Sequence, residues 1–354
     1  MKTLPRISLS LFWPLALLVS LFVLVQALSR FPGAVETGYT RFIYAGLTAF
    51  LTGITGRVPF SISEISLYLA TGGVVFLIAR SIRRRAWQAG VTALGQFLAI
   101  VLAWFYLGWG LNYFRLPVDE QLGFANEHAE PDSLALRQNL EWSLTATNTT
   151  WRQVPAWKID RLDDEIEACY KRVYEALRLP LMPGKRPPKF PLISGVLNYT
   201  LTSGIFGPFW HEIHLSSSLL PIELPFVLAH EKAHQMGYAR ESEANFLAAL
   251  VCLASADSSV QYSGYFALLG SFFRRAGEFS DRDSLLHAIR PEVRADFKAV
   301  RERVQKYQGA VSEVSWKTYD TYLRVNKVEG GTKNYGDVVS LMIRWRAHRG
   351  EGKP

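Results

Sequence analysis

The residues best suited to chemistry are two histidines four positions apart, His230 and His234, in the segment His-Glu-Lys-Ala-His. Side chains at this spacing lie on one face of an α-helix, so both imidazoles can reach a single metal ion. Glu231 lies about 100° further around such a helix, where it can contact a metal-bound water without being a ligand. The spacing predicts a catalytic zinc site in which Glu231 activates the zinc-bound water.

Two histidines leave a catalytic zinc ion short of one protein ligand, because such ions usually have three. In one continuous helix Glu241 would lie about 10 Å from His234 along the axis, too far to share an ion. Gly237 offers a bend, because glycine readily adopts the left-handed conformation that ends helices. A second helix can then return Glu241 to the histidines, with Asn245 one turn later to hydrogen-bond the outer nitrogen of a ligand histidine. We therefore predict one Zn²⁺ per chain.

Lys232 places a charge inside the motif, where uncharged residues are usual. On a helix it projects away from the two histidines, so we expect a solvated side chain. The alternative interpretation of the segment is an exposed, charged helix face with two incidental histidines. The apolar residues of Leu224–Ala229, directly before the motif, argue against that alternative.

The pattern resembles the gluzincin metallopeptidases, whose third zinc ligand is the first glutamate of Glu-x-x-x-Asp on a later helix. Here the Asp position holds Asn245, and the gap from His234 to Glu241 is short. Similar stretches over nearly the full length are Gly56–Glu64, Trp109–Arg115, His230–Phe246, Gln261–Tyr265, Tyr319–Arg324 and Tyr335–Gly336. Together they resemble a family of bacterial membrane proteins known as domain of unknown function 3810. The resemblance implies a membrane-anchored zinc peptidase with no established substrate.

Three protein ligands leave one coordination position open, which favours hydrolysis of peptide bonds. Glu231 would take a proton from the zinc-bound water and pass it to the leaving amine. The alternative is a non-enzymatic, zinc-stabilised membrane sensor or scaffold, which would need a fourth protein ligand. If Glu241 is not the third ligand, Glu243 is the next candidate. An intramembrane protease is excluded, because charged residues around the motif, such as Lys232 and Arg240, would be costly in a bilayer core.

Length and charge bound the class of protein. The 354 residues allow one large or two ordinary domains. The net charge of +8 lies near the N-terminus, since residues 1–114 hold 9 Lys+Arg against 2 Asp+Glu, whereas 115–354 hold 30 against 29. This basic excess flanks apolar segments, so no nucleic-acid partner is expected. Cys169 and Cys252 have apolar, helical-looking surroundings, which favours buried free thiols over a disulfide.

Three apolar runs predict a membrane anchor within residues 1–114. Leu11–Leu28, Ile62–Ala79 and Ala89–Leu111 are each about long enough to cross a bilayer core. The first run is interpreted as an uncleaved anchor rather than a signal peptide. The positive-inside rule places the N-terminus and the arginines of 80–85 in the cytoplasm of a bacterium. The remainder, 115–354, would then be an extracytoplasmic domain of a multi-pass protein of the cytoplasmic (inner) membrane.

Two further features lie close to these runs. Thr40–Thr55 is apolar but short and interrupted by glycines, which suits a helix lying in the outer interface rather than a fourth crossing. Trp104, Trp109 and Tyr113 fit either an interfacial aromatic belt at the end of the third run or ordinary helix packing.

From residue 115 onward the composition is globular, and the expected fold class is α+β, mostly helical. Three N-terminal transmembrane helices would thus precede a zincin-like metallopeptidase domain with a small sheet. Helices are predicted at Pro131–Leu144, Ile159–Leu177, Tyr262–Phe273, Pro291–Tyr307 and Tyr335–Arg346, with a surface loop at 178–191. Patterns at Leu192–Thr202 and His211–Leu219, around the turn-like Gly204–Pro208, predict strands directly before the zinc helix.

A peptide or protein substrate, for example of the envelope or the membrane, could add to an edge strand of this sheet through backbone hydrogen bonds. His214, Leu215 and Ser216 are the expected contacts, together with Tyr335. His211 and His214 face opposite sides of a strand, so they are interpreted as polar edge-strand residues and not as a second metal site. Tyr319 and Tyr335 are also candidates to donate a hydrogen bond to a developing oxyanion, with a packed tyrosine as the alternative.

Overall fold

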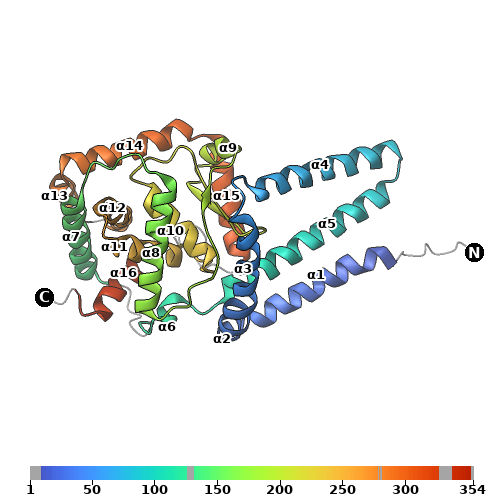
Figure 1. The fold of residues 1–354 in the computed structure, drawn as a ribbon, viewed down its shortest axis with the longest axis horizontal. Helices are drawn as coiled ribbons and strands as arrows, with labels where there is room; N and C mark the ends of the chain where they lie inside the picture. The colour runs from blue at the N-terminus through green and yellow to red at the C-terminus, as the bar shows by residue number, and fades with distance from the viewer. Residues whose placement is uncertain (1–8, 126–130, 278, 280, 327–336, 352–354) are drawn as a thin grey trace, which may run out of the picture.

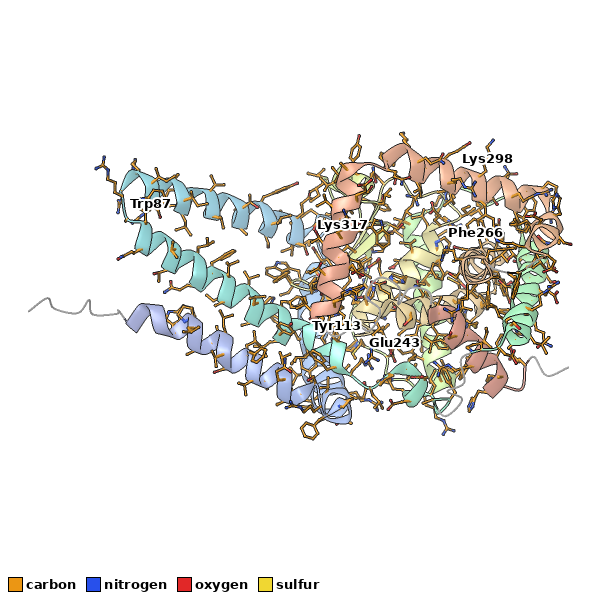
Figure 2. All side chains as sticks on the ribbon, turned by 180° about the vertical axis from the view of Figure 1, so that it is seen from behind. Trp87, Tyr113, Glu243, Phe266, Lys298 and Lys317 are labelled. Carbon is orange, nitrogen blue, oxygen red and sulfur yellow. The ribbon has the colours of Figure 1, made fainter. Side chains whose placement is uncertain are left out.

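The computed structural model describes residues 9–125, 131–277, 279, 281–326 and 337–351. Three helices project side by side from a helical body that also holds one three-stranded sheet (Figure 1). Figure 2 shows Trp87 at the far end of this projection and Tyr113 where the projection meets the body. The expected class, mostly helical with a small sheet, is confirmed.

The projecting helices are α1 (Leu9–Leu28), α4 (Ile62–Arg83) and α5 (Trp87–Gly108). Helices α4 and α5 are each long and apolar enough to cross a membrane, in agreement with two of the predicted spans. A third candidate arises if Trp13–Leu28 and the bent segment Pro32–Thr55 are counted as one span, and that pair is bent by 107°. The start of α1 and the turn between α4 and α5 lie at the same end, away from the body (Figure 1).

After α1 the chain turns sharply and runs across the base of the projection. This arm consists of α2 (Pro32–Ala34), the π-helix η1 (Val35–Tyr44) and α3 (Ala45–Thr55). The helix expected at 40–55 is therefore present, and its 107° bend from α1 sets it across the projecting helices (Figure 1). Its inner face is buried: Tyr39 and Tyr44 lie in the common core, and Leu51 is 3% exposed.

The sheet has the strand order β1-β3-β2. Strand β3 (Glu212–Leu215) pairs in parallel with β1 (Pro188–Lys189) and antiparallel with β2 (Gly204–Gly207). The prediction of an edge strand at 211–219 is therefore wrong, because β3 is the central strand. The segment 204–208, expected to be a turn, supplies the edge strand β2 instead, and the loop predicted at 178–191 contains β1.

The strand predicted at 192–202 is wrong, since this segment contains the helix α9 (Ser194–Tyr199). A distant contact provides the reason. The Glu64 carboxylate accepts hydrogen bonds from the backbone amides of Leu192 (3.0 Å) and Ile193 (2.8 Å). These bonds turn the chain immediately before α9, and a tertiary contact of this kind overrides the β preference of single residues.

Helices make up the rest of the body, and those predicted at 159–177 and 291–307 are confirmed with the same bounds. The helices at 131–144 and 262–273 are confirmed but longer, and the one at 335–346 is described from Asp337 onward. Helix α15 was not predicted. The body helices are α6 (Val118–Gln121), α7 (Ser133–Thr150), α8 (Ile159–Leu177), α10 (Leu224–Gln235), α11 (Glu241–Leu253), α12 (Ser258–Arg275), α13 (Arg282–Ala288), α14 (Pro291–Tyr307), α15 (Ala310–Val325) and α16 (Asp337–His348).

The projection and the body share one hydrophobic core. The 3-10 helix η2 (Gly110–Phe114), which follows α5, is buried entirely. Trp109 and Tyr113 are 6% and 4% exposed, so ordinary packing is the correct alternative for both, whereas Trp104 remains 40% exposed on α5. Cys169 and Cys252 are buried free thiols, as predicted.

Candidate metal centre

The site is built by the consecutive helices α10 and α11, which pack against each other around a bend at Gly237. Gly237 has φ +85°, the left-handed conformation predicted for it. A side chain here would also meet Asn112, since a Cβ atom would lie 3.1 Å from the Asn112 Oδ1 atom. Beyond the bend, α11 begins at Glu241. Glu241 is thus brought back to the face of α10 that carries His230 and His234.

Three ligand atoms of this group face one another. The His230 Nε2 atom lies 3.0 Å from His234 Nε2 and 3.1 Å from Glu241 Oε2, and His234 Nε2 lies 3.6 Å from Glu241 Oε2. Atoms bound to one tetrahedral ion at about 2.0–2.1 Å are about 3.3 Å apart. The spacing therefore fits three ligands of a single metal ion. Within the described ranges, no other group of histidines, cysteines and carboxylates has such a spacing.

Two polar atoms of this group, His230 Nδ1 and Glu241 Oε2, are buried without a hydrogen-bond partner among the described residues. Glu241 is 3% exposed, and its Oε2 atom accepts no hydrogen bond. Burial alone would lower the pKa of His234, but the nearby Glu241 carboxylate outweighs burial and raises that pKa to about 9. Burial likewise opposes ionisation of Glu241, yet the two histidines hold the pKa of this carboxyl well below its usual range. The group thus attracts positive charge, and a metal ion could take the place of the proton on His234.

Glu231 lies next to the group without belonging to it. It is 4% exposed, its Oε2 atom has no hydrogen-bond partner, and burial raises the pKa of its carboxyl. Gly204 of β2 lies directly against it, since a Cβ atom at that position would be 2.7 Å from the Glu231 Oε1 atom. A side chain at position 204 would therefore clash with the Glu231 carboxylate.

The contacts that orient the ligands differ from those predicted. The outer nitrogen of His234, Nδ1, lies 2.7 Å from the backbone oxygen of Tyr238. Asn245 makes no hydrogen bond to either histidine, and His230 Nδ1 has no partner among the described residues. Sequence reasoning missed Tyr238, because its contribution comes from the backbone.

Two aromatic residues from distant segments also touch the group. Tyr319 of α15 donates a hydrogen bond from its hydroxyl to the Glu241 carboxylate. Trp109, just beyond α5, donates from Nε1 to the backbone oxygen of His234 at 3.1 Å and packs edge-on against its ring. Tyr319 was a candidate oxyanion donor, with a packed tyrosine as the alternative, and in the structure its hydroxyl bonds the third candidate ligand. Tyr335 lies outside the described residues.

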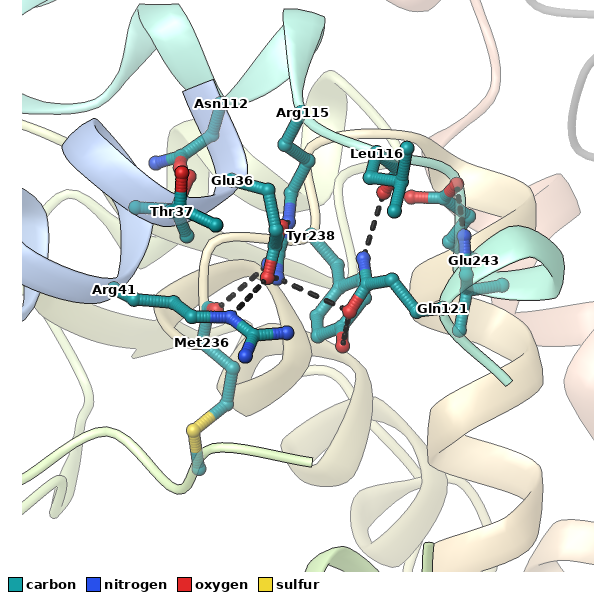
Figure 3. A network of polar contacts seen from close by, with 12 residues as sticks. Glu36, Thr37, Arg41, Asn112, Arg115, Leu116, Gln121, Met236, Tyr238 and Glu243 are labelled. Atoms are coloured by element: carbon teal, nitrogen blue, oxygen red, sulfur yellow. Dashed lines mark hydrogen bonds and ion pairs between the residues drawn. The ribbon is translucent and has the colours of Figure 1, made fainter. Parts of the chain in front are cut away.

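A buried polar network contacts Met236 and Tyr238, the residues on either side of the bend at Gly237 (Figure 3). The Arg115 guanidinium donates to the Glu36 carboxylate, with Nε 2.8 Å from Oε2, and to the Met236 backbone oxygen at 3.1 Å. It also stacks on the Tyr238 ring, 4.1 Å from the centroid. The Glu243 carboxylate has a structural contact of its own, because it accepts a hydrogen bond from the Val118 amide at 3.1 Å. Arg115 therefore fixes the segment that orients His234, and Glu243 is not placed as a ligand.

Lys232 corrects another prediction. It is not solvated but fully buried, 0% exposed, on the side of α10 away from the histidines. Its Nζ atom lies 2.5 Å from Glu167 Oε1, 2.6 Å from Asp163 Oδ1 and 2.8 Å from the Arg186 backbone oxygen. Both acids are on α8, so this cluster binds the metal-site helix to its neighbour.

The residues of β3 also have a different setting from the one predicted. His211, Glu212, His214, Leu215 and Ser216 are all buried rather than displayed on an edge. The Glu212 carboxylate accepts from the amides of Ile62 (3.0 Å) and Ser63 (2.8 Å), at the start of α4. These residues join the sheet to α4. Because β3 is the central strand, an incoming chain could pair only with an edge strand, β1 or β2.

Comparison with known proteins places the chain in one family. A family model described as "Protein of unknown function (DUF3810)" matches residues 39–343, well over half of the chain. No curated protein and no solved structure shows significant similarity to the chain.

Proposed function

The chain belongs to the DUF3810 family of proteins of unknown function, and from this premise we propose that it is a membrane-anchored zinc metallopeptidase. His230, His234 and Glu241 would hold the ion, and Glu231 would act as the general base. The proposed substrates are peptides or proteins on the extracytoplasmic side of the bacterial cytoplasmic membrane.

The observation that carries this proposal is that Glu231 lies beside the three candidate metal ligands. Three side chains converge on one point with the spacing of metal ligands, and a fourth, Glu231, is buried beside them with an unpartnered oxygen. A buried carboxylate without partners is costly unless it has a task. When bound, a zinc ion would supply Lewis acidity to polarise a peptide carbonyl and acidify a water.

The chain's own residues suit the remaining steps. The raised pKa of Glu231 makes its carboxylate a better proton acceptor. The same carboxylate lies next to Gly204 of the edge strand β2. Tyr319 holds Glu241 in place through its hydroxyl. The Tyr238 backbone oxygen fixes the tautomer of His234 so that Nε2 keeps its lone pair for the ion.

The membrane orientation is proposed from the charges together with the fold. Arg80, Arg83, Arg84 and Arg85 lie at the end of the projection farthest from the body, as does the start of α1 (Figure 1). The positive-inside rule then places this end in the cytoplasm and the body outside.

The alternative, a metal-stabilised sensor or scaffold, would need a fourth protein ligand. The described residues offer three, and the fourth candidate, Glu231, lies outside the group. This arrangement favours an enzyme over a scaffold.

The test uses the full-length protein purified in detergent with zinc. Metal content is measured by mass spectrometry and cleavage by release of new amino termini from envelope peptides. Wild type should bind one zinc per chain and cleave, whereas Glu231→Gln should retain zinc and lose cleavage. Retained cleavage in Glu231→Gln would refute the role of Glu231, and absence of zinc from wild type would refute the proposal itself.

A further inference from the structure

We propose that the substrate of this site is a membrane-inserted polypeptide, cut close to the point where it leaves the outer leaflet while its extended chain lies along the free edge of β2. The inference rests on the proposed peptidase function and adds the substrate class. Three features of the structure support it: the path of β2, the attachment of the turn that follows β2, and the apolar surface around both.

Strand β2 leads from the metal centre to the first turn of α4. At one end, Gly204 is so close to Glu231 that a Cβ atom would lie 2.7 Å from its carboxylate. At the other end, a Cβ atom on Gly207 would lie 3.1 Å from the Ser63 hydroxyl of α4. Three extended residues cover about 10 Å. Strand β2 therefore covers about 10 Å between its contact with the general base and its contact with the start of a candidate membrane span.

The turn between β2 and β3 rests on both candidate spans. The Trp210 indole nitrogen donates to the Ser66 hydroxyl of α4 at 2.8 Å. From α5, the Trp104 indole nitrogen donates to the Phe209 backbone oxygen at 3.2 Å. A chain that follows β2 away from Glu231 therefore arrives at the outer ends of α4 and α5.

One edge of β2 is available for pairing. Its only partner in the described ranges is β3, on the other edge. An extended segment can add to a free edge through backbone hydrogen bonds, with little demand on its sequence. On β2 itself, Phe206 is buried and Ile205 is 46% exposed, so the strand also offers one apolar side chain to an incoming peptide.

Exposed apolar side chains surround this end of the body. We call Phe60, Phe190, Leu192 and Phe209 the apolar rim; they are 52%, 47%, 90% and 36% exposed, respectively. The Leu192 amide donates to Glu64 in the first turn of α4, which fixes the rim at the level where the span begins. Apolar surface continuous with a span is suited to lipid. The bilayer surface would thus reach the far end of β2.

A soluble protein has no anchor that would hold its chain beside this rim. A polypeptide already anchored in the bilayer needs only three to five extended residues to reach from the surface to Glu231, by the same rise per residue of about 3.3 Å. Peptide bonds that near to a span are poorly accessible to a protease whose site stands further from the bilayer. The site is therefore placed for the juxtamembrane segments of membrane proteins.

The experiment reconstitutes the purified full-length protein with zinc into phosphatidylethanolamine–phosphatidylglycerol vesicles. The vesicles also receive detergent-extracted membrane proteins from cells that lack this chain, together with a salt-extracted mixture of peripheral proteins. New amino termini are mapped by mass spectrometry for wild type and for Glu231→Gln. We expect termini that depend on Glu231 to lie in integral proteins, within about ten residues of a span end.

The outcomes separate this inference from the function on which it rests. Termini that depend on Glu231 but lie in peripheral proteins, or far from any span, would overturn the inference and leave the peptidase function standing. No terminus that depends on Glu231 would overturn the peptidase function, and the inference with it.

A pair of variants tests the rim. Leu192→Asp places a charge on the most exposed residue of the rim, and Leu134→Asp is the matched control, a 63% exposed leucine on α7 away from the projection (Figure 1). We expect Leu192→Asp to lower the yield of near-membrane termini severalfold while zinc content stays at one per chain, and Leu134→Asp to match wild type. Equal yields from the two variants would overturn the placement of β2 at the bilayer surface.

Discussion

Helix α10 carries two buried polar clusters on opposite faces, and they differ in how their charges are matched. On one face, His230 and His234 meet Glu241, whose Oε2 atom accepts no hydrogen bond. On the other face, Lys232 is surrounded by Asp163, Glu167 and the Arg186 backbone oxygen, all within 2.8 Å of its Nζ atom.

The difference shows which kind of burial indicates a binding site. Lys232 is the more deeply buried, yet its charge is neutralised by the protein's own acids, so it requires nothing further. In the histidine cluster, the ion-pair partners of Glu241 are the two histidines, and no lysine or arginine in the described part of the chain contacts it, so a metal ion could supply the cation. Unmatched groups therefore identify the site better than burial or charge does, and four experiments can test this distinction.

The largest expected effect concerns the matched cluster. Lys232→Met leaves Asp163 and Glu167 without their shared cation, and loss of one partner from a buried pair costs about 3–5 kcal/mol. We expect thermal unfolding in detergent at a clearly lower temperature than wild type, with unchanged zinc per folded chain. Unchanged stability combined with lost zinc would reverse the roles assigned to the two faces.

The next effect concerns the unmatched cluster. A ligand that binds only the folded state stabilises it by about 2.7 kcal/mol at a hundredfold excess over its Kd. Zinc should therefore raise the unfolding temperature of wild type but not that of Glu241→Ala. Glu243→Gln is the comparison for a neighbouring buried carboxylate, and it should keep the response to zinc. A response retained in Glu241→Ala and lost in Glu243→Gln would transfer the ligand role to Glu243.

A smaller effect is expected where a distant residue supports a ligand. Tyr319→Phe removes the hydroxyl that holds Glu241 but leaves the ring. Loss of such an outer partner typically weakens metal binding by about tenfold or more, or ~1.4 kcal/mol. Competition against a chromophoric zinc chelator measures the change. Tyr322→Phe, one helical turn away and bonded to Tyr113 instead, is the control that should bind zinc as wild type does.

The smallest effect is the response of the matched cluster to acid. Burial disfavours the Glu167 carboxylate, but Arg186 and Lys232 outweigh burial and lower its pKa to about 2. A lowered pKa in the folded state gives stability that is complete above about pH 4.5 and is lost as the pH falls toward 2. Burial raises the pKa of Asp163, which acts in the opposite sense. We expect a net loss of about 1 kcal/mol on acidification, and a smaller loss in Glu167→Gln, in unfolding curves recorded with chelator.

The sequence was sufficient for the features that depend on neighbouring residues. The fourfold spacing of His230 and His234 and the bend at Gly237 follow from helix geometry and from the freedom of glycine. Their convergence with Glu241 could therefore be predicted before any coordinates. Long helices such as α8 and α14 were equally accessible, because each has a clear start signal and a sustained apolar period.

Features that depend on distant residues could not be predicted. The partner that buries Lys232, Glu167, is 65 positions away, and the hydroxyl on Glu241 comes from a residue 78 positions away. The strands β1, β2 and β3 have only two to four residues, too few to show alternation, and their order depends on long-range pairing. For that reason the edge strand was assigned to 211–219 rather than to 204–207.

The joint between the projection and the body has a practical consequence for work on the isolated body. A chain truncated to begin at Arg115 would leave that buried guanidinium without Glu36. Glu212 would lose the amides of Ile62 and Ser63, and the Lys189 ammonium would lose the Thr55 and Phe60 carbonyls. Such a fragment would leave the Arg115 guanidinium unpaired and the Lys189–Glu212 ion pair short of its backbone hydrogen bonds, so it should misfold rather than stay soluble. The projecting helices and the arm that follows α1 thus serve as a structural scaffold for the body and not as a removable tether.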